Sequence, residues 1–385
     1  MDISYIINRL GEENDDYFGA LAPPIMQTSN FVFKKVDDLR KAIADEKNSL
    51  VYSRGNNPTL SILSKKLAAL EGTDECLLFS SGMAAISTAV IANIKKGDHI
   101  ICVQKPYSWT VHLMQDLLPR FGIEITMIDG QTINEYENAL KPNTGMLYLE
   151  SPNTFTFEMQ DLEKAAQFAK RHKLIAVIDN SYSTPLLQQP SKYGIDIICH
   201  SASKYIGGHS DTVAGVLCCG NEMAEKIFKN DYLTLGGIIS PFNAWLLLRG
   251  LRTLPVRMEK IGATTEKLIE FLEKHPRVEK VNYPYSVNHP QFDLAKKQMK
   301  HGNGLFSVCF RASVESISEM CESFKYFQMA VSWGGYESLV FPVCTLSPQH
   351  NSGNISGKHV RFSIGLEDAD VLINDMENAF GKLSD

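Results

Sequence analysis

Short apolar runs alternate with segments of helical spacing between residues 58 and 200. The runs expected to form strands are 76–80, 99–103, 123–128, 145–150, 175–179 and 195–200. Segments whose apolar positions recur at helical spacing lie between them, at 60–70, 82–94, 110–120 and 161–172. Buried strands that alternate with helices predict an α/β domain with a mostly parallel sheet, covered by helices on both faces.

The pattern differs at the two ends of the chain. Residues 1–50 show a mixed pattern of polar and apolar positions, and Pro23-Pro24 interrupts regular structure there. Residues 27–31 have the pattern of an extended segment. We therefore expect this part of the chain to form an arm. After residue 245 we expect a smaller α+β domain. Its expected elements are helices at 244–251, 256–274, 314–324 and 368–382, a strand at 304–311 and a polar loop at 346–358. The chain is therefore divided into an arm at 1–50, a large domain at 51–245 and a C-terminal domain at 246–385.

Composition narrows the class of protein. A hydrophobic content of 44% and a charged content of 21% are typical of a soluble globular chain. The net charge of −6 disfavours nucleic acid as a partner. The sequence has no apolar run near the ~20 residues of a membrane span, and no secretion signal at its start. The 8 Cys form no Cys-x-x-Cys pair and the 10 His no zinc spacing, so we expect reduced thiols, no metal and a cytoplasmic location.

The segment after the strand at 195–200 carries the main candidate chemistry. Lys204 follows that strand closely, and ligands bind at the strand ends of open parallel sheets. A partly desolvated lysine near other cations has a lowered pKa and condenses with aldehydes. Ser201 and Ser203 are candidate donors to a phosphate group. A lone lysine after a strand is more often a solvated surface residue, so other features must support this reading.

Two such features precede Lys204. Asp179 ends the strand at 175–179, where a buried carboxylate needs a cationic partner such as a protonated pyridine nitrogen. Its structural alternative is a helix cap or an ion pair. Gly82 and Met83 follow a short strand and begin a helix, whose free amides and dipole favour an anion. Taken alone, this Ser-Gly start is often only a cap.

Together these features resemble the Cys/Met-metabolism family of pyridoxal 5′-phosphate (PLP) enzymes, also called the cystathionine β-lyase/cystathionine γ-synthase family. The resemblance covers nearly the whole chain. Its motifs are Ala22-Pro23-Pro24-Ile25, Tyr52-Ser53-Arg54, Asn57-Pro58-Thr59, Ser81-Gly82-Met83-Ala84, Glu150-Ser151-Pro152, Asp179-Asn180, 201–209, Arg249-Gly250-Leu251, Ser332 with Gly334-Gly335, Glu337-Ser338-Leu339, and Arg361 with Ser363. It implies fold type I, with 51–245 as the PLP-binding domain.

The resemblance also implies residue roles. Lys204 would hold PLP as a Schiff base and act as the base, Asp179 would face the pyridine nitrogen, and Tyr107 would stack on the ring. Tyr52 and Arg54 would enter the site of a neighbouring subunit, with Arg54 on the phosphate. This implies a homo-oligomer, and we expect a tetramer built as a dimer of dimers.

For the substrate, the resemblance implies that Arg361 binds the carboxylate, with Ser332 beside it. The chain departs from the family where an asparagine usually touches the ring oxygen or the substrate carboxylate. There it has Thr154, and we expect Thr154 or Asn153 to supply this contact. The catalytic candidates are Lys204, Tyr107 and Tyr52.

The segment from Ser332 to Leu339 carries Trp333 and Tyr336, as in bacterial cystathionine β-lyases, and Val331 disfavours the γ-acting members that have glutamate there. We therefore expect a carbon–sulfur lyase that cleaves cystathionine, or a related cysteine S-conjugate, by β-elimination.

Two alternatives remain. One is a γ-acting member of the family, such as a methionine or cystathionine γ-lyase, a cystathionine γ-synthase or a homocysteine synthase. The other is a PLP-binding regulatory protein without turnover, disfavoured because Lys204 and Arg361 are both present. A dinucleotide-dependent dehydrogenase is disfavoured because no Gly-x-Gly-x-x-Gly follows an early strand.

Overall fold

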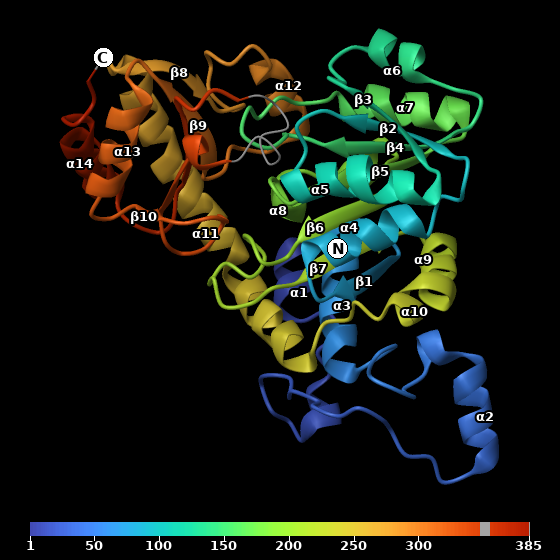
Figure 1. The fold of residues 1–385 in the computed structure, drawn as a ribbon. Coiled ribbons are helices and arrows are strands. Elements are labelled where there is room, and N and C mark those ends of the chain that lie inside the picture. The colour runs from blue at the N-terminus through green and yellow to red at the C-terminus, as the bar shows by residue number, and fades with distance from the viewer. Residues whose placement is uncertain (347–354, 385) are drawn as a thin grey trace.

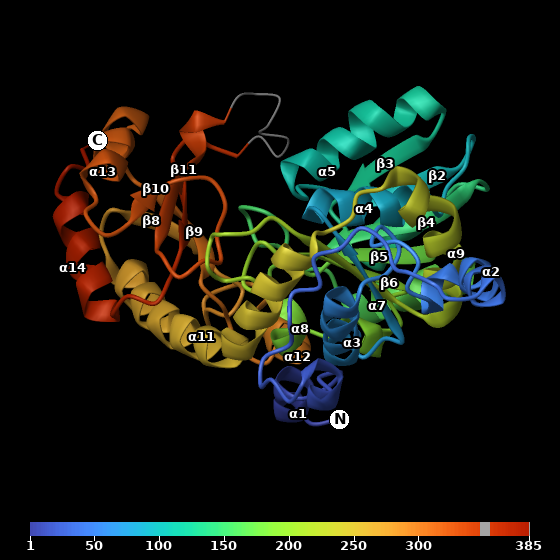
Figure 2. The same cartoon turned by 90° about the horizontal axis from the view of Figure 1, so that it is seen from below.

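The structure is a computed structural model that describes residues 1–346 and 355–384. It contains a large α/β domain, a smaller C-terminal α+β domain and an N-terminal arm (Figures 1 and 2). Part of the expected loop at 346–358, residues 347–354, lies outside the described residues. The predicted fold class is confirmed.

The large domain is built on a seven-stranded sheet of order β1-β7-β6-β5-β4-β2-β3 in the described part of the chain. The strands are β1 (Glu75–Phe79), β2 (His99–Val103), β3 (Glu124–Ile128), β4 (Thr144–Glu150), β5 (Ile175–Asp179), β6 (Ile197–Ser201) and β7 (Gly215–Cys219). Strands β2 to β6 pair in parallel, whereas β7 pairs antiparallel with both β1 and β6. Sequence analysis missed β7.

Successive residues of each central strand face opposite sides of this sheet, which creates two cores. On one side, Ile178 of β5 packs with helices α3 (Pro58–Glu71), α6 (Ile133–Ala139) and α7 (Leu162–His172). On the other, Val177 packs with α4 (Gly82–Ile91) and α9 (Asn221–Ile227). Continuous burial explains why these strands read as unbroken apolar runs.

The expected helix at 110–120 consists of three segments. Helix α5 (Ser108–His112) continues into a π-helical turn (Leu113–Leu117) and a 3-10 turn (Leu118–Phe121). Pro119 has no N–H to donate, and Gly122 ends the segment with a φ of 74°. Shorter helical segments elsewhere are α8 (Thr184–Leu187), α10 (Leu233–Leu235), Asn14–Tyr17, Glu46–Asn48, Pro190–Tyr193, Phe228–Tyr232 and Val343–Thr345.

A single helix, α11 (Pro241–Lys274), replaces the two helices expected at 244–251 and 256–274. The predicted break was wrong because the helix continues through Pro255. Buried Arg257 donates to the carbonyl of Gly250 in the same helix at 2.8 Å and to that of Tyr205, in the loop after β6, at 2.7 Å. The expected domain boundary at 245/246 thus falls inside α11, which runs from the large domain into the small one (Figure 1).

The small domain contains a five-stranded sheet of order β10-β11-β12-β9-β8 among the described residues. Its elements are β8 (Val278–Asn282), α12 (Phe292–Gln298), β9 (Leu305–Phe310), α13 (Val314–Ser323), β10 (Gln328–Met329), β11 (Leu339–Pro342), β12 (His359–Ser363) and α14 (Ala369–Phe380). Except for β10 with β11, neighbouring strands are antiparallel. This agrees with the α+β expectation.

The N-terminal arm contains α1 (Ile3–Asn8) and α2 (Val36–Ala44). Buried Lys66 of α3 donates to the carbonyls of Ile6 and Ile7, which fixes α1 to the body. The following segment with α2 extends from the body (Figure 1). It exposes several large apolar side chains, including Phe18, Leu21, Val32 and Val36.

Across the described residues, no helix is long and apolar enough to cross a membrane. The same part of the chain contains no group of three or more His, Cys, Asp or Glu residues that could hold a metal ion. The eight cysteines are free thiols, and all except Cys344 are buried.

Candidate active site

The carboxyl ends of three adjacent strands bring the main candidates together. Glu150 at the end of β4 is in register with Asp179 at the end of β5, and Asp179 is in register with Cys199 on β6. The chain leaves β6 at Ser201 and turns, with the amide of Lys204 donating to the carbonyl of Ser201 at 3.2 Å. The topology thus places Lys204 at the strand ends near Asp179, as expected from the sequence.

Lys204 is partly buried, and it lies between the end of β6 in the large domain and the segment of Ser332 and Trp333 in the small domain. Its Nζ donates to Ser332 Oγ at 2.5 Å and lies 5.4 Å from the centre of the Trp333 ring. Burial lowers the pKa of Lys204 to about 8, and the nearby Arg361 charge adds to the effect. A neutral amine is therefore accessible near neutral pH, as attack on an aldehyde requires.

Asp179 is 7% exposed and has one oxygen already bonded. Its Oδ1 accepts from the Ser181 amide at 2.9 Å and from Ser181 Oγ at 2.6 Å. Burial raises the pKa of Asp179, although Ser181, His200 and Lys204 oppose the rise. A protonated ring nitrogen at Oδ2 would supply the close cationic partner that such a buried carboxylate needs.

The start of α4 provides a cradle for an anion. Ser81 caps the helix by accepting from the Ala84 amide at 3.0 Å, which leaves the first amides, those of Gly82 and Met83, without acceptors inside the helix. A Cβ on Gly82 would come within 2.8 Å of Ser201 Cβ, so only glycine lets the helix start lie against the end of β6.

Ser203 is close to the same region, but its hydroxyl has backbone partners. Its Oγ accepts from the Ala214 amide at 2.9 Å and lies 3.3 Å from the Ala214 carbonyl. A phosphate could receive the hydroxyl proton while the bond from the Ala214 amide remains. This geometry therefore allows the Ser203 hydroxyl to donate to a phosphate, as predicted.

Glu150 connects Tyr107 with Thr154. Its Oε2 accepts from the Tyr107 amide and its Oε1 pairs with Thr154 Oγ1, both at 2.8 Å. The side chain of Asn153 instead donates to Glu158 and accepts from Thr156. This geometry favours Thr154 over Asn153 as the replacement for the family's asparagine.

Arg361 on β12 is buried beside the rings of Phe155 and Phe341, and its guanidinium carbon lies 5.2 and 5.0 Å from their centres. Its Nη2 donates to the carbonyl of Ser332 at 2.9 Å. Burial lowers the pKa of Arg361 to about 10, so the guanidinium remains charged at neutral pH. Among the described residues it has no carboxylate partner, so this buried cation suits the carboxylate of a ligand.

Ser332 joins the two cationic groups. Its Oγ accepts from Lys204 and its carbonyl accepts from Arg361. The residue has a φ of 79°, a left-handed conformation uncommon for a non-glycine residue. One strained residue therefore fixes the amine and the guanidinium relative to each other.

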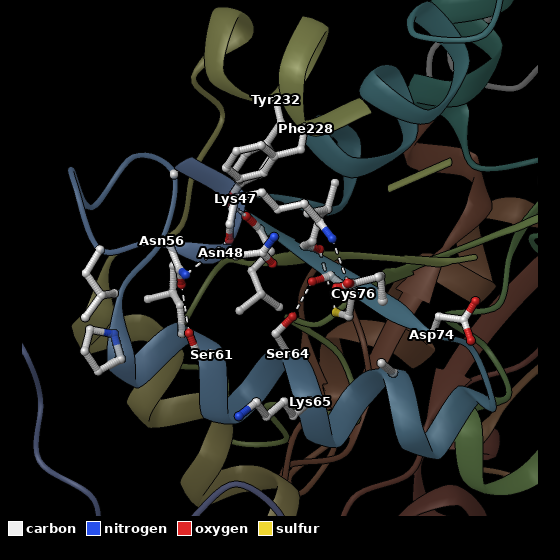
Figure 3. A pocket seen from close by; sticks show the side chains of 18 residues that line it. Lys47, Asn48, Asn56, Ser61, Ser64, Lys65, Asp74, Cys76, Phe228 and Tyr232 are labelled. Atoms are coloured by element: carbon white, nitrogen blue, oxygen red, sulfur yellow. Dashed lines mark hydrogen bonds and ion pairs between the residues drawn. The ribbon is translucent and has the colours of Figure 1, made fainter. Parts of the chain in front are cut away.

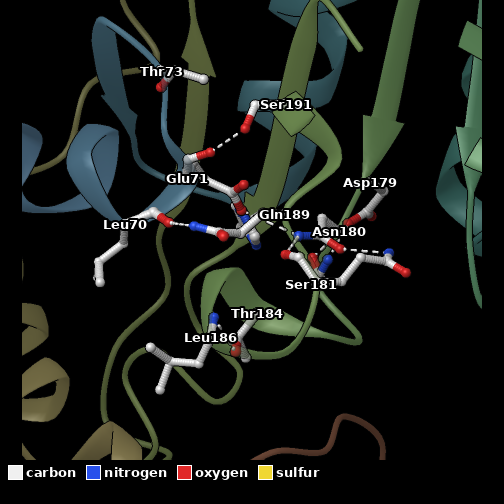
Figure 4. Close-up of polar contacts among 12 residues, drawn as sticks. Leu70, Glu71, Thr73, Asp179, Asn180, Ser181, Thr184, Leu186, Gln189 and Ser191 are labelled. Atoms are coloured by element: carbon white, nitrogen blue, oxygen red, sulfur yellow. Dashed lines mark hydrogen bonds and ion pairs between the residues drawn. The ribbon is translucent and has the colours of Figure 1, made fainter. Parts of the chain in front are cut away.

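A buried polar network supports the strand ends from behind. His200 Nε2 lies 2.5 Å from Glu71 Oε1, and Asn180 Nδ2 donates to the same oxygen at 3.1 Å. Gln188 Nε2 donates to the carbonyl of Ser151 at 2.9 Å and to the Asn180 side chain at 2.9 Å. Figure 4 shows Glu71 and Asn180 in this network, which ties the ends of β4, β5 and β6 to α3.

Among the described residues, no hydrogen bond, ion pair or ring contact joins the side chain of Tyr52 or Arg54 to these residues. Both are exposed, and the Arg54 guanidinium lies 5.2 Å from the centre of its own Tyr52 ring. The adjoining Gly55 and Asn56 line a cavity of about 580 Å³ between the arm, α3 and β1 (Figure 3). None of the predicted site residues lines this cavity, whose far wall includes Phe228.

Three supporting residues escaped the sequence analysis. Glu150 was recognised only as part of the Glu-Ser-Pro motif, and Ser181 and Arg257 had no assigned role. The signal for Glu150 and Ser181 was their position at or just after a buried strand end, where a polar side chain requires partners. Arg257 gave no such signal, because an arginine in a long amphipathic helix normally faces solvent.

The arrangement fits PLP on three independent features. A buried carboxylate with a free oxygen suits the ring nitrogen, a helix start with glycine suits the phosphate, and a lysine with a lowered pKa suits the aldehyde.

Comparisons with known proteins agree with this geometry. The model of the "Cys/Met metabolism PLP-dependent enzyme" family matches residues 5–381. The L-methionine gamma-lyase of Fusobacterium nucleatum subsp. nucleatum is 36% identical over 374 residues, which cover 95% of each chain. The cystathionine beta-lyase MetC of Bacillus subtilis is 34% identical over 97% of this chain and 94% of its own.

A solved structure shares the fold. The crystal structure of metB from Corynebacterium glutamicum has a TM-score of 0.93 at 36% identity, covering 99% of this chain and 98% of that one. The fold is therefore fold type I and the cofactor is PLP. On its family match, its relatives and its fold, the chain belongs to the Cys/Met metabolism family of PLP-dependent enzymes.

Proposed function

We propose that this protein is a carbon–sulfur lyase that cleaves cystathionine, or a related cysteine S-conjugate, by β-elimination. The observation that carries the proposal is the joint attachment of Lys204 and Arg361 to Ser332. An α-amino acid carries its carboxylate and its removable proton on the same carbon. A guanidinium and an amine held by one residue are suited to bind the first and remove the second.

The residues of the site would have separate roles in binding and in proton transfer. Arg361 binds the substrate carboxylate, and Asp179 keeps the ring nitrogen protonated. PLP, when bound, supplies an electron-accepting ring that stabilises negative charge at the α-carbon. Lys204 Nζ removes the α-proton, and Lys204, Tyr107 or the neighbouring subunit's Tyr52 gives a proton to the departing thiolate. Water then converts the three-carbon fragment to pyruvate and ammonia.

Trp333 supports elimination at the β-carbon. Its ring lies 5.4 Å from Lys204 Nζ and 5.4 Å from the Tyr205 ring centre, so it forms a fixed wall beside the base. We expect this ring to shorten the space that a bound substrate has beyond its α-carbon. Val331 adds no charge that could hold the distal amine of a γ-bound substrate.

A γ-acting enzyme is the second candidate, because relatives at 36% identity include an L-methionine gamma-lyase and a cystathionine gamma-lyase of Bacillus subtilis. The same lysine could serve both routes. The β-carbon would then lose a proton as well, and the keto acid would retain four carbons.

Identification of the keto acid made from cystathionine tests the proposal. Chromatography should show pyruvate with homocysteine as the main products, and Lys204→Ala protein should form neither. Mainly 2-oxobutyrate with cysteine would reassign the enzyme as a γ-lyase. Reaction only with an added thiol or activated homoserine would reassign it as a synthase.

We further propose that the active unit is a dimer within a tetramer, with Tyr52 and Arg54 entering the partner's site. The exposed apolar side chains of the arm and the exposed positions of Tyr52 and Arg54 support this assembly. Each site would then need Lys204 from one subunit and Arg54 from the other.

Subunit mixing gives the first prediction. When Lys204→Ala and Arg54→Ala proteins exchange subunits at equal concentration, mixed dimers contain one doubly defective site and one intact site. Activity should return to about a quarter of the wild-type level, since half of randomly paired dimers are mixed. Mass spectrometry of differently tagged subunits verifies exchange, and exchange without recovered activity would exclude a shared site.

Arg361 gives the second prediction. Arg361→Ala should raise KM for every amino-acid substrate, because one side of a buried charge pair is lost. The expected loss of substrate-binding free energy is roughly 2–5 kcal/mol. PLP binding should persist. Arg361→Lys retains the charge but not the forked geometry, so its KM should fall between those of the wild type and of Arg361→Ala. An unchanged KM in the alanine variant would assign the carboxylate to another residue.

A further inference from the structure

Four strands of the small sheet contribute one residue each to a single row. Phe341 of β11 lies opposite Arg361 of β12, which in turn lies opposite Ser307 of β9. Asn282 of β8 lies opposite Ser307 on its other side. Residues directly opposite each other on antiparallel strands project from the same face of a sheet. The Arg361 side chain therefore has an aromatic neighbour on one strand and a hydroxyl neighbour on the other.

A turn of the large domain is docked on this row. The carbonyl of Phe155 accepts from Ser307 Oγ at 2.6 Å, and Ser307 Oγ accepts from Asn282 Nδ2 at 3.0 Å. Ser307 is fully buried and Asn282 is nearly so. Because the Asn282 amide donates to the serine oxygen, the single hydroxyl proton is left for the Phe155 carbonyl. The small sheet thus holds the backbone of Phe155.

The backbone at Phe155 has an unusual conformation. Its φ is 64°, and the Thr156 amide donates to the Thr154 carbonyl at 2.9 Å, which closes a three-residue turn. A left-handed conformation is uncommon for a bulky residue and persists where surrounding contacts enforce it. The same turn carries Thr154, whose hydroxyl donates to Glu150 at 2.8 Å. Contacts from both domains therefore fix the position of the Phe155 ring.

The two aromatic rings and the guanidinium of Arg361 form a compact cluster. The guanidinium carbon lies 5.2 Å from the Phe155 ring centre and 5.0 Å from that of Phe341, and the two ring centres are 5.9 Å apart. Cation–π attraction acts within about 6 Å of a ring centre and is stronger where water is excluded. Arg361 is 9% exposed and Phe155 is 8% exposed, so both rings attract a largely desolvated cation.

These contacts prepare Arg361 for a ligand. Among the described residues, the Ser332 carbonyl is the hydrogen-bond acceptor of the guanidinium, and it uses only part of a fork of five N–H donors. A mobile arginine side chain would lose rotational freedom when it bound a carboxylate, which weakens binding. The rings of Phe155 and Phe341 restrict that freedom before the ligand arrives.

We propose that Phe155 and Phe341 are positioning residues whose rings hold the Arg361 guanidinium in the orientation that binds the substrate carboxylate. Phe155 belongs to the large domain and Phe341 to the small one, so carboxylate recognition depends on the turn at Phe155 being docked on the small sheet. This role rests on the proposed role of Arg361. It predicts that the rings favour a ligand with a carboxylate over the same ligand without one.

Two ligands that differ only at the carboxylate test this role in the PLP-loaded, full-length protein. L-Alanine and L-alaninamide both carry the α-amine, and neither has a leaving group on its β-carbon. Titration followed by visible absorbance gives their Kd values. Phe155→Leu and Phe341→Leu should each raise the Kd of L-alanine about tenfold, the effect of one desolvated cation–π contact, and leave the Kd of L-alaninamide unchanged.

The same variants should divide the kinetic parameters. KM for cystathionine should rise with the Kd of L-alanine, whereas kcat and PLP affinity should stay at the wild-type level. Ser307→Ala removes the hydrogen bond to the Phe155 carbonyl and should raise the Kd of L-alanine in the same direction. Arg361→Ala should abolish the preference for L-alanine over L-alaninamide.

Phe310→Leu is the matched control. Phe310 is a fully buried residue of β9 that packs 5.3 Å from the Phe380 ring centre. It lies three residues beyond Ser307 and therefore on the opposite face of the sheet. Its substitution should lower Tm and leave the Kd values of both ligands unchanged.

Wild-type Kd values for L-alanine in both leucine variants would overturn the proposal. Equal weakening of L-alanine and L-alaninamide would also overturn it, because the rings would then support the site only in general. If Phe155→Leu does not fold, Phe341→Leu decides, since its ring is only partly buried. Absence of keto acid from wild-type protein would refute the lyase function, whereas the two Kd values would still judge the rings.

Discussion

Replacing Lys204 with alanine should lower turnover about 10²- to 10⁴-fold, the usual contribution of a positioned proton-transfer group. The variant loses the amine that attaches PLP and the base that removes the α-proton. It should still bind PLP non-covalently through the Asp179 and Gly82 ends of the site. Keto-acid formation and retention of PLP on gel filtration measure the two effects separately.

A surface lysine provides the control for this variant. Exposed Lys297 of α12 pairs at 2.7 Å with Glu163 of α7, so Lys297→Ala should keep full turnover. Near wild-type turnover by Lys204→Ala would remove Lys204 from the mechanism.

Lys204 also predicts the pH dependence of cofactor loading. Only the neutral amine attacks an aldehyde, and the pKa of Lys204 is lowered to about 8. The rate of PLP attachment to cofactor-free protein should therefore rise as pH increases through about 8 and then level off. Stopped-flow absorbance measures this rate, and a rate that still climbs near pH 10 would show an ordinary lysine.

Replacing Asp179 with alanine should lower kcat on the order of a hundredfold or more, as expected for a lost electrostatic partner of the reacting system. An unprotonated ring nitrogen is a poor electron sink, so chemistry should suffer more than PLP binding. The ¹⁵N chemical shift of labelled PLP reports the protonation directly. It should change from the protonated to the neutral range in the variant.

Asp179→Asn is the matched control for shape, since it preserves volume but not charge. It should show the same shift change and a similar loss of kcat with a smaller loss of PLP affinity. A protonated nitrogen and full turnover in both variants would mean that another group serves the ring.

Most strands of the large sheet could be predicted from the sequence, because they are buried on both faces and therefore form continuous apolar runs. Strand β7 was missed because its antiparallel course follows the loop after Lys204 and interrupts the βα alternation. The join across Pro255 was also missed. The residues on both sides of Pro255, such as Leu251, Leu254 and Met258, are buried in the core, and local sequence does not show that this packing keeps the helix continuous.

For the site, sequence motifs indicated Lys204, Asp179 and Arg361, and the structure brings the first two to the strand ends and connects the first and third through Ser332. The contacts that tune these residues could not be predicted. Glu150 accepts from the Tyr107 amide and Glu71 pairs with His200 across long stretches of sequence, and a single sequence does not record which polar side chains meet.

The central claim is that Lys204 is the residue that carries PLP in a site completed by Asp179. Reduction of the purified, PLP-loaded protein with borohydride, followed by proteolysis and mass spectrometry, tests this claim most directly. We expect the pyridoxyl label on the peptide that contains Lys204, and loss of that label in Lys204→Ala. A label on another lysine, or a protein that takes up no PLP, would contradict it.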